Sequence, residues 1–253
     1  MMPIKLLLAF ALLTFPAASF GQLKVIMSGG FSAAYQEIVP EFEKSTGITV
    51  ATTRGPSQGD SPNAIGAQLR RGVVADMVIM SREGLEPLLA EGRFVPGTVV
   101  DLVQVPLGMS VRAGAPIPDI RTVEAFTQTL LRAKLIGMQS TSAIYLTTTV
   151  FPKLGIAGAL SGKLNGSGAA AVARGESELT ILPVSELLHV PGTEFAGTIP
   201  AEIQRVMVFS AALLKGSQES VAAKRLISLL SSESATKPIR KFGMEPMTPA
   251  SKR

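Results

Sequence analysis

Strand and helix patterns alternate along the chain from Leu23 onward, and this alternation restricts the possible folds more than any other feature. The short apolar run Leu23 to Met27 is followed by apolar side chains at helical spacing between Tyr35 and Phe42. Ile48 to Thr53 and Ala75 to Met80 repeat the strand pattern, and each precedes another helical pattern. Strands that alternate with helices pair mainly in parallel. The sequence therefore predicts an α/β protein.

Two longer apolar stretches, Leu102 to Val111 and Val206 to Leu214, are candidate crossovers between two parts of the chain. The strand–helix alternation restarts between them, so the chain would leave one sheet, build a second and return to finish the first. We expect one lobe from residues 22–105 and 207–253 and a second lobe from residues 106–206. Two lobes of this kind leave a cleft between them, which is a binding architecture.

The N-terminal segment has the composition of a secretory signal peptide. Lys5 is its only charged residue, Leu6 to Phe15 is apolar, and small residues follow at Ser19 and Gly21. The apolar run is shorter than the about 20 residues that cross a bilayer, so we do not expect an integral membrane protein. Residues 1–21 are predicted to be a signal peptide cleaved after Gly21, with Ser19 as the alternative, which places the mature protein in the periplasm.

The composition excludes several kinds of site. The formal charge is only +5, and no run of basic residues is longer than two, as at Lys252 and Arg253 in the tail, whereas nucleic-acid binders carry a clustered basic face. This balance suits a small anionic ligand better. His189 is the one histidine and cysteine is absent, so we expect no metal site. Neither GxxxxGK[ST] nor GxGxxG occurs, and no nucleotide or other cofactor is expected.

The candidate ligand-binding residues lie in turns directly after predicted strands of both lobes. Turns rich in Ser and Gly hold anions through hydroxyls and backbone N–H groups, assisted by the helix that follows. The alternative is that small polar residues occupy such turns without binding anything. Because three such turns face one predicted cleft, we favour binding. The residues are Ser28, Gly29, Ser57, Thr141 and Ser142.

Three further side chains have two possible interpretations each. Arg54 could hold a carboxylate with its bidentate guanidinium, or it could be an ordinary solvated arginine. Tyr145 could close over the ligand with its hydroxyl, or pack in the core of the second lobe. Glu186 could act as a proton-transfer base, or simply begin a helix.

Gly55 to Gly59 also matches the GxSxG pattern of a nucleophile elbow, with Ser57 as the nucleophile. In an elbow the helix begins at the serine, whereas here Ser61 and Pro62 predict a helix start several residues later. We therefore interpret the match as accidental and do not predict a serine hydrolase.

Six segments in order give the chain a resemblance to the family of periplasmic molybdate-binding proteins. They are Leu23 to Gly30, Phe42 to Gly47, Arg71 to Ile79, Val111 to Pro116, Phe209 to Ala211 and Leu226 to Glu233. The resemblance implies the two-lobed type II periplasmic-binding-protein fold. It also implies a monomer that captures a small anion, either an oxyanion or a di- or tricarboxylate, for an ABC-type importer and its permease.

Two segments, Gly55 to Ala75 and Ser185 to Gly192, are similar to a side branch of this family, the aconitate isomerases. This implies an alternative function, in which the protein shifts a double bond in a tricarboxylate with Glu186 and Tyr145 as the catalytic candidates. The chain departs from that branch where Leu182 to Val184 replace a glutamine pair, and where Ser140 to Ile144 lack a glycine. We therefore expect binding without turnover, and a sensor without a transporter is the third possibility.

Overall fold

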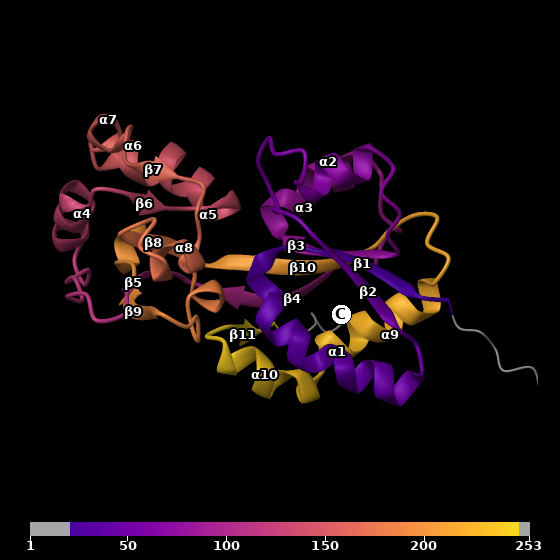
Figure 1. Cartoon of the computed structure of the whole chain (residues 1–253). Coiled ribbons are helices and arrows are strands. Elements are labelled where there is room, and N and C mark those ends of the chain that lie inside the picture. The colour runs from indigo at the N-terminus through magenta and orange to yellow at the C-terminus, as the bar shows by residue number, and fades with distance from the viewer. Residues whose placement is uncertain (1–20, 248–253) are drawn as a thin grey trace, which may run out of the picture.

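The computed structural model describes residues 21–247 of the chain. It contains two α/β lobes side by side, each built on its own sheet (Figure 1). The predicted mixed α/β class is therefore confirmed. The signal-peptide prediction falls almost entirely on residues outside the described range. None of the helices in the described range combines the length and the apolar character that crossing a bilayer requires.

The sheet of the first lobe has six strands in the order β11-β4-β10-β3-β1-β2. The strands are β1 (Leu23–Met27), β2 (Val50–Arg54), β3 (Met77–Ser81), β4 (Val100–Val105), β10 (Met207–Leu213) and β11 (Glu245–Pro246). β1 pairs in parallel with β2 and β3, whereas β10 is antiparallel to both β3 and β4. The carboxyl ends of β1, β2 and β3 therefore open on one edge of the sheet.

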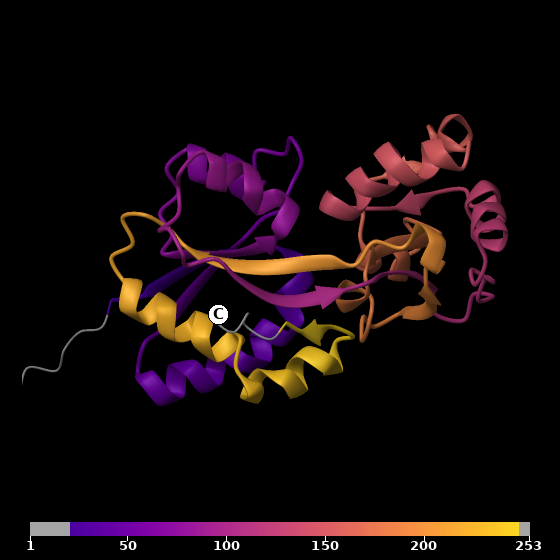
Figure 2. The same ribbon diagram turned by 180° about the vertical axis from the view of Figure 1, so that it is seen from behind.

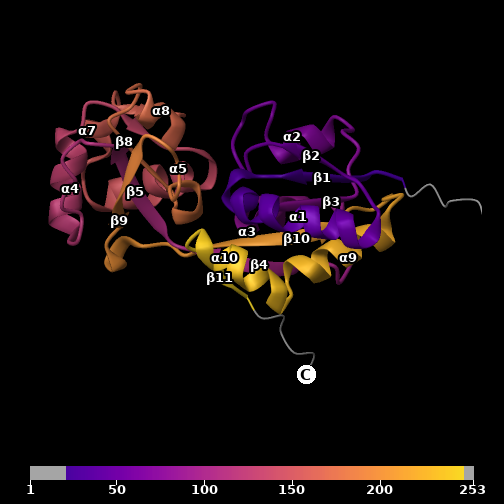
Figure 3. The same ribbon diagram turned by 60° about the horizontal axis from the view of Figure 1, so that its bottom comes forward.

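Helices cover both faces of this first sheet. They are α1 (Ser32–Thr46), α2 (Ile65–Arg70), α3 (Arg82–Ala90), α9 (Ser220–Leu230) and α10 (Thr236–Lys241), with short 3-10 turns η1 (Gly29–Phe31) and η5 (Glu233–Ala235). Ile26 packs with α2 and α3, while its neighbours Val25 and Met27 pack with α1 and α9. This follows from the alternation of side chains along a strand. Figure 3 shows α1, α9 and α10 together on one side of the sheet.

The start of α2 differs from the prediction. Ser61 and Pro62 were expected to begin the helix, but it begins at Ile65. Ser61 Oγ instead accepts a hydrogen bond of 3.2 Å from the N–H of Asn63, which closes a local turn. Serine offers the backbone this alternative to a helix. The shift lengthens the loop after β2, and that loop borders the cleft.

The sheet of the second lobe has five strands in the order β7-β6-β8-β5-β9. They are β5 (Leu107–Arg112), β6 (Ile136–Gly137), β7 (Leu164–Asn165), β8 (Leu179–Pro183) and β9 (Thr193–Thr198). The helical segments are α4 (Val123–Arg132), α5 (Ser140–Tyr145), α6 (Phe151–Lys153), α7 (Ala157–Leu160), α8 (Ala169–Ala173), the π-helical η2 (Leu146–Val150), and the 3-10 turns η3 (Val184–Glu186) and η4 (Ala201–Ile203). α5, η2 and α6 run on without a break.

Two passages of chain join the lobes. The apolar stretch from Leu102 to Val111 is split at Pro106, so that β4 belongs to the first sheet and β5 to the second. Proline has no N–H to continue a strand pairing, which suits it to this change of sheet. β10 brings the chain back into the first sheet, and Figure 2 shows β4 and β10 side by side where they approach the second lobe.

Asp76, just before β3, connects several segments of the first lobe through its buried carboxylate. Its carboxylate is 3 % exposed and accepts four hydrogen bonds. One comes from the N–H of Lys24 at 2.8 Å, one from the hydroxyl of Ser217 at 2.8 Å, and two from the N–H groups of Gln218 and Glu219 at 3.1 and 3.2 Å. The last two N–H groups precede α9, so this carboxylate joins β1, β3 and the start of α9.

Candidate functional site

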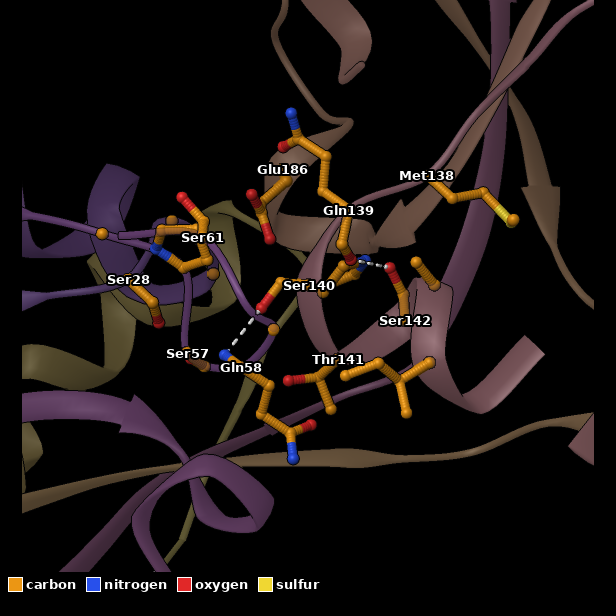
Figure 4. Close-up of a pocket in the computed structure, with 18 of the residues that line it drawn as sticks. Ser28, Ser57, Gln58, Ser61, Met138, Gln139, Ser140, Thr141, Ser142 and Glu186 are labelled. Atoms are coloured by element: carbon orange, nitrogen blue, oxygen red, sulfur yellow. Dashed lines mark hydrogen bonds between the residues drawn. The ribbon is translucent and has the colours of Figure 1, made fainter. Parts of the chain in front are cut away.

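A cavity of about 760 Å³ lies between the lobes, at the edge where the strands of the first sheet end. Its walls come from the turns after β1 and β2, from the start of α5, and from η3. Figure 4 shows Ser28, Ser57 and Ser61 of the first lobe on one side and Thr141 and Ser142 of the second lobe on the other. The cavity therefore takes polar side chains from both lobes.

Ser28 follows β1 and has the most informative hydroxyl of the first lobe. Its N–H donates to the carbonyl of Ile79 at 2.9 Å, which fixes the turn. Ser28 lines the cavity but is only 4 % exposed, and its buried Oγ has no hydrogen-bond partner among residues 21–247. A buried hydroxyl without a partner costs free energy. A polar ligand in the cavity would supply the missing partner.

The next turn brings Arg54 and Ser57 to the same cavity. Arg54 ends β2, its side chain is exposed, and its guanidinium donates to Ser32 Oγ at the start of α1. Ser57 is buried, and its Oγ accepts a 2.9 Å hydrogen bond from the N–H of Ser81. A hydroxyl has one proton to donate in addition to accepting, so Ser57 can still donate to a ligand.

The start of α5 brings Thr141 and Ser142 to the cavity, but their hydroxyls already have protein partners. Ser142 Oγ donates to the carbonyl of Gln139 at 2.8 Å, and Thr141 Oγ1 lies 2.9 Å from Ser81 Oγ of the first lobe. Ser140 Oγ accepts from the N–H of Gln58 at 3.2 Å. The last two contacts join the lobes directly beside the cavity.

Ser140 has a backbone conformation that a glycine would adopt more easily. Its φ is +50°, in the left-handed region that L-residues rarely occupy. Residues held in this region cost about 1–3 kcal/mol and concentrate at functional sites. Ser140 is therefore a strained position beside the cavity, although the sequence alone did not mark it.

Glu186 ends η3 and is a partly buried carboxyl group on the cavity wall. It packs so closely on Gly29 that a methyl group added there would collide with the carboxylate. Ser185 beside it donates to the carbonyl of Gly30 at 2.6 Å, which ties η3 to η1. Burial raises the pKa of Glu186 to about 7, because the charged form loses solvation and no cation compensates it.

Tyr145 does not reach the cavity, contrary to the interpretation that it closes over the ligand. Its hydroxyl donates to the carbonyl of Ile203 at 3.1 Å, and the guanidinium of Arg205 lies over its ring at 5.2 Å. Arg205 in turn pairs with Glu83 of α3 at 3.0 Å. Tyr145 therefore contacts residues of its own lobe and packs against the apolar core, and it is not part of the cavity wall.

His189 also lies away from this cavity. It lines a smaller neighbouring cavity of about 520 Å³, where its Nε2 lies 3.2 Å from the carbonyl of Lys241. Within residues 21–247, no three His, Asp or Glu side chains gather in a way that could hold a metal ion.

Several cavity residues were not predicted from the sequence. The polar ones are Gln58, Asp60, Ser61, Asn63, Gln139 and Ser140, and the apolar ones include Met138, Met207 and Phe209. The polar residues lie in the same two turns as the predicted serines. The position of those turns after strands was the signal that could have identified them.

Solved structures share this architecture. The periplasmic molybdate-binding protein of Azotobacter vinelandii superposes with a TM-score of 0.71 at 19% identity, covering 90% of this chain and 100% of that one. The sulfate-binding protein SubI of Mycobacterium tuberculosis superposes with a TM-score of 0.70 at 17% identity, covering 90% of this chain and 88% of that one. Sequence identities below 20% show only that the fold is shared. This shared fold is the two-lobed fold that the sequence resemblance implied.

Sequence comparison shows the family. An aconitate isomerase from a Pseudomonas species is 37% identical over 230 residues, which cover 89% of this chain and 88% of that protein. Residues 23–245 match the model of a family described as bacterial extracellular solute-binding protein. The chain belongs to this family of bacterial extracellular solute-binding proteins.

Proposed function

We propose that the cleft binds a small organic di- or tricarboxylate, and the size and lining of the cavity carry this proposal. The cavity measures about 760 Å³ in a form whose lobes already touch. A water molecule takes up about 30 Å³, and a tetrahedral oxyanion is only a few times larger. An oxyanion would leave most of this space unfilled, whereas an organic acid with several carboxylates would occupy it.

The chemistry of the walls supports the same ligand class. Ser28 Oγ lacks a partner and Ser57 retains a proton to donate, so both can bind a carboxylate. Gln58 and Gln139 of opposite lobes each donate one amide N–H to a backbone carbonyl and retain a second one, and Arg54 at the edge can approach a second carboxylate. The apolar residues Met138, Met207 and Phe209 suit the carbon chain between the carboxylates. The 37% identical relative is named for aconitate, which is a tricarboxylate.

We further propose that the protein works in the periplasm as a monomer that delivers its ligand to an ABC-type importer. Membership of the extracellular solute-binding family supports export, which would require the leader predicted for residues 1–21. A solved neighbour with a TM-score of 0.63, from Clostridium difficile, is described as the substrate-binding domain of a putative molybdenum ABC transporter. A sensor that has no permease would share the ligand but not this partner.

Replacing Ser28 by alanine is expected to weaken trans-aconitate binding by about 10- to 150-fold, because a hydrogen bond to a charged group contributes about 1.5–3 kcal/mol. Isothermal titration calorimetry would measure the change. Ser110→Ala is the matched control, since Ser110 Oγ in β5 is also buried without a partner but lies away from the cavity. Equal affinities for wild type and Ser28→Ala would place the ligand elsewhere.

A second candidate function is isomerisation of a tricarboxylate, and Glu186 is the observation that favours it. An ionised carboxylate on the cavity wall would repel the anionic ligand of a receptor. An isomerase, however, needs a base that removes a proton from one carbon and returns one to another, ideally with a pKa near the working pH. Glu186 has a pKa of about 7, although Tyr145 is not available as its partner. Steady formation of cis-aconitate from the trans isomer, absent in Glu186→Gln, would establish this function.

A further inference from the structure

The charges on the cavity wall do not suit an anion while Glu186 is ionised. Among residues 21–247, the charged residues that line the cavity are Arg54, Asp60 and Glu186, and their sum is then +1 − 2 = −1. The guanidinium of Arg54 is engaged with Ser32 at the edge, and Asp60 is exposed to solvent. Protonation of Glu186 would bring the sum to zero and would remove the negative charge nearest to the ligand.

Within residues 21–247, no basic side chain forms an ion pair with Glu186, although Arg54 lines the same cavities. Glu186 also borders the smaller cavity, which shares Gly29 and Arg54 with the larger one and adds Glu37 of α1 and His189. Lys241 of α10 lies nearby, but its ammonium pairs with Glu37. Desolvation is accordingly the one cause behind the raised pKa of Glu186. A proton is the remaining way to neutralise this carboxylate.

We infer that Glu186 contacts the ligand as the protonated acid, so that each carboxylate ligand enters the cleft together with one proton. This inference rests on the proposed function and identifies Glu186 as a specificity-determining residue. A protonated carboxyl donates a short, strong hydrogen bond to a carboxylate, whereas the ionised form repels it. The proton comes from solvent.

The pH dependence of binding follows from this linkage. The complex holds one more proton than the free protein wherever free Glu186 is ionised, so binding weakens as the pH rises. Because the free carboxyl has a pKa of about 7, affinity is expected to change little below pH 7. Above pH 7 the Kd is expected to rise about tenfold per pH unit. The last carboxyl of a polycarboxylate has a raised pKa because the other carboxylates repel its charge, so the slope is read above pH 7, where the ligand is fully ionised.

Calorimetric titration with trans-aconitate between pH 6 and pH 8.5 tests the inference. Paired buffers of different ionisation enthalpy give the number of protons taken up, and wild type is expected to approach one per ligand at pH 8. Glu186→Gln keeps a neutral donor, so its Kd is expected to stay constant with pH and to be about 30-fold below the wild-type value at pH 8.5. His189→Asn is the matched control and is expected to keep the wild-type slope, since asparagine tolerates the left-handed backbone at this position.

Each result of these titrations either supports or overturns a stated proposal. Binding by wild type without proton uptake and without a pH slope overturns the inference but leaves the carboxylate site standing. A slope that persists in Glu186→Gln and disappears in His189→Asn also overturns it, because the proton then belongs to His189. Absence of binding to trans-aconitate, tricarballylate and succinate at every pH overturns the proposed function itself. Proton uptake is measured on wild type, so the test does not depend on the variants folding.

Discussion

At pH 8 the ligand-free Glu186→Gln variant is expected to have a free energy of unfolding about 3 kcal/mol greater than that of wild type. In the folded protein the pKa of Glu186 is about 7, compared with 4.5 for an ordinary glutamate. Each pKa unit corresponds to about 1.4 kcal/mol, so ionising this carboxyl in the fold costs about 3 kcal/mol. The neutral amide of glutamine avoids the cost.

The sign of the pH dependence is fixed by the direction of the shift. Between pH 4.5 and pH 7 the folded state keeps the proton of Glu186 while the unfolded chain has lost it. Stability from this group is therefore fully present below about pH 4.5 and is lost as the pH rises to 7. The difference between variant and wild type is expected to be near zero at pH 4.5 and to reach its full size above pH 7.

Urea denaturation followed by circular dichroism at pH 4.5, 6, 7 and 8 would measure this difference. Glu202→Gln is the matched control, because Glu202 is exposed in η4, and its effect is expected to stay within about 0.5 kcal/mol. A Glu186→Gln difference that does not change with pH would mean that the carboxyl is not desolvated in the fold.

Asp76→Ala is expected to lower the free energy of unfolding by about 3–4 kcal/mol, through the loss of four hydrogen bonds to a buried carboxylate. The variant leaves the N–H groups of Lys24, Gln218 and Glu219 without their acceptor. The measurement is urea denaturation at pH 7.

Asp119→Ala is the matched control for Asp76. Asp119 is an exposed carboxylate that pairs with Arg121 at 2.9 Å, and exposed pairs of this kind contribute about 0–1 kcal/mol. Similar losses for Asp76→Ala and Asp119→Ala would contradict the structural role of the buried carboxylate.

Local patterns in the sequence were sufficient for the fold and for part of the site. The alternation of strands and helices predicted the α/β class, and Pro106 falls where the chain changes sheet. Ser28, Ser57 and Ser142 each follow a strand, and strand ends of both sheets meet at the cavity, so the turn residues were found together. Their contact with a ligand stays a prediction.

Contacts between distant residues could not be read from the sequence. The hydroxyl of Tyr145 donates a hydrogen bond to the carbonyl of Ile203, which lies 58 positions further along the chain. No local pattern in the sequence indicates that partner. The lack of a partner for Glu186 is likewise a property of the packed structure, since it depends on which elements surround η3. Asp76 was not recognised for the same reason, because three of its four donors lie more than 140 positions along the chain.

The central claim is that the cleft takes an organic polycarboxylate and not an oxyanion, and a thermal-shift titration at pH 6 tests it most directly. Ligand at 100 times its Kd adds about 2.7 kcal/mol of stability, which corresponds to a rise in Tm of roughly 5–10 °C for a protein of this size. Trans-aconitate or tricarballylate is expected to produce this rise, while molybdate and sulfate at the same concentrations leave the Tm unchanged. A rise with molybdate or sulfate, and none with any carboxylate, would contradict the account.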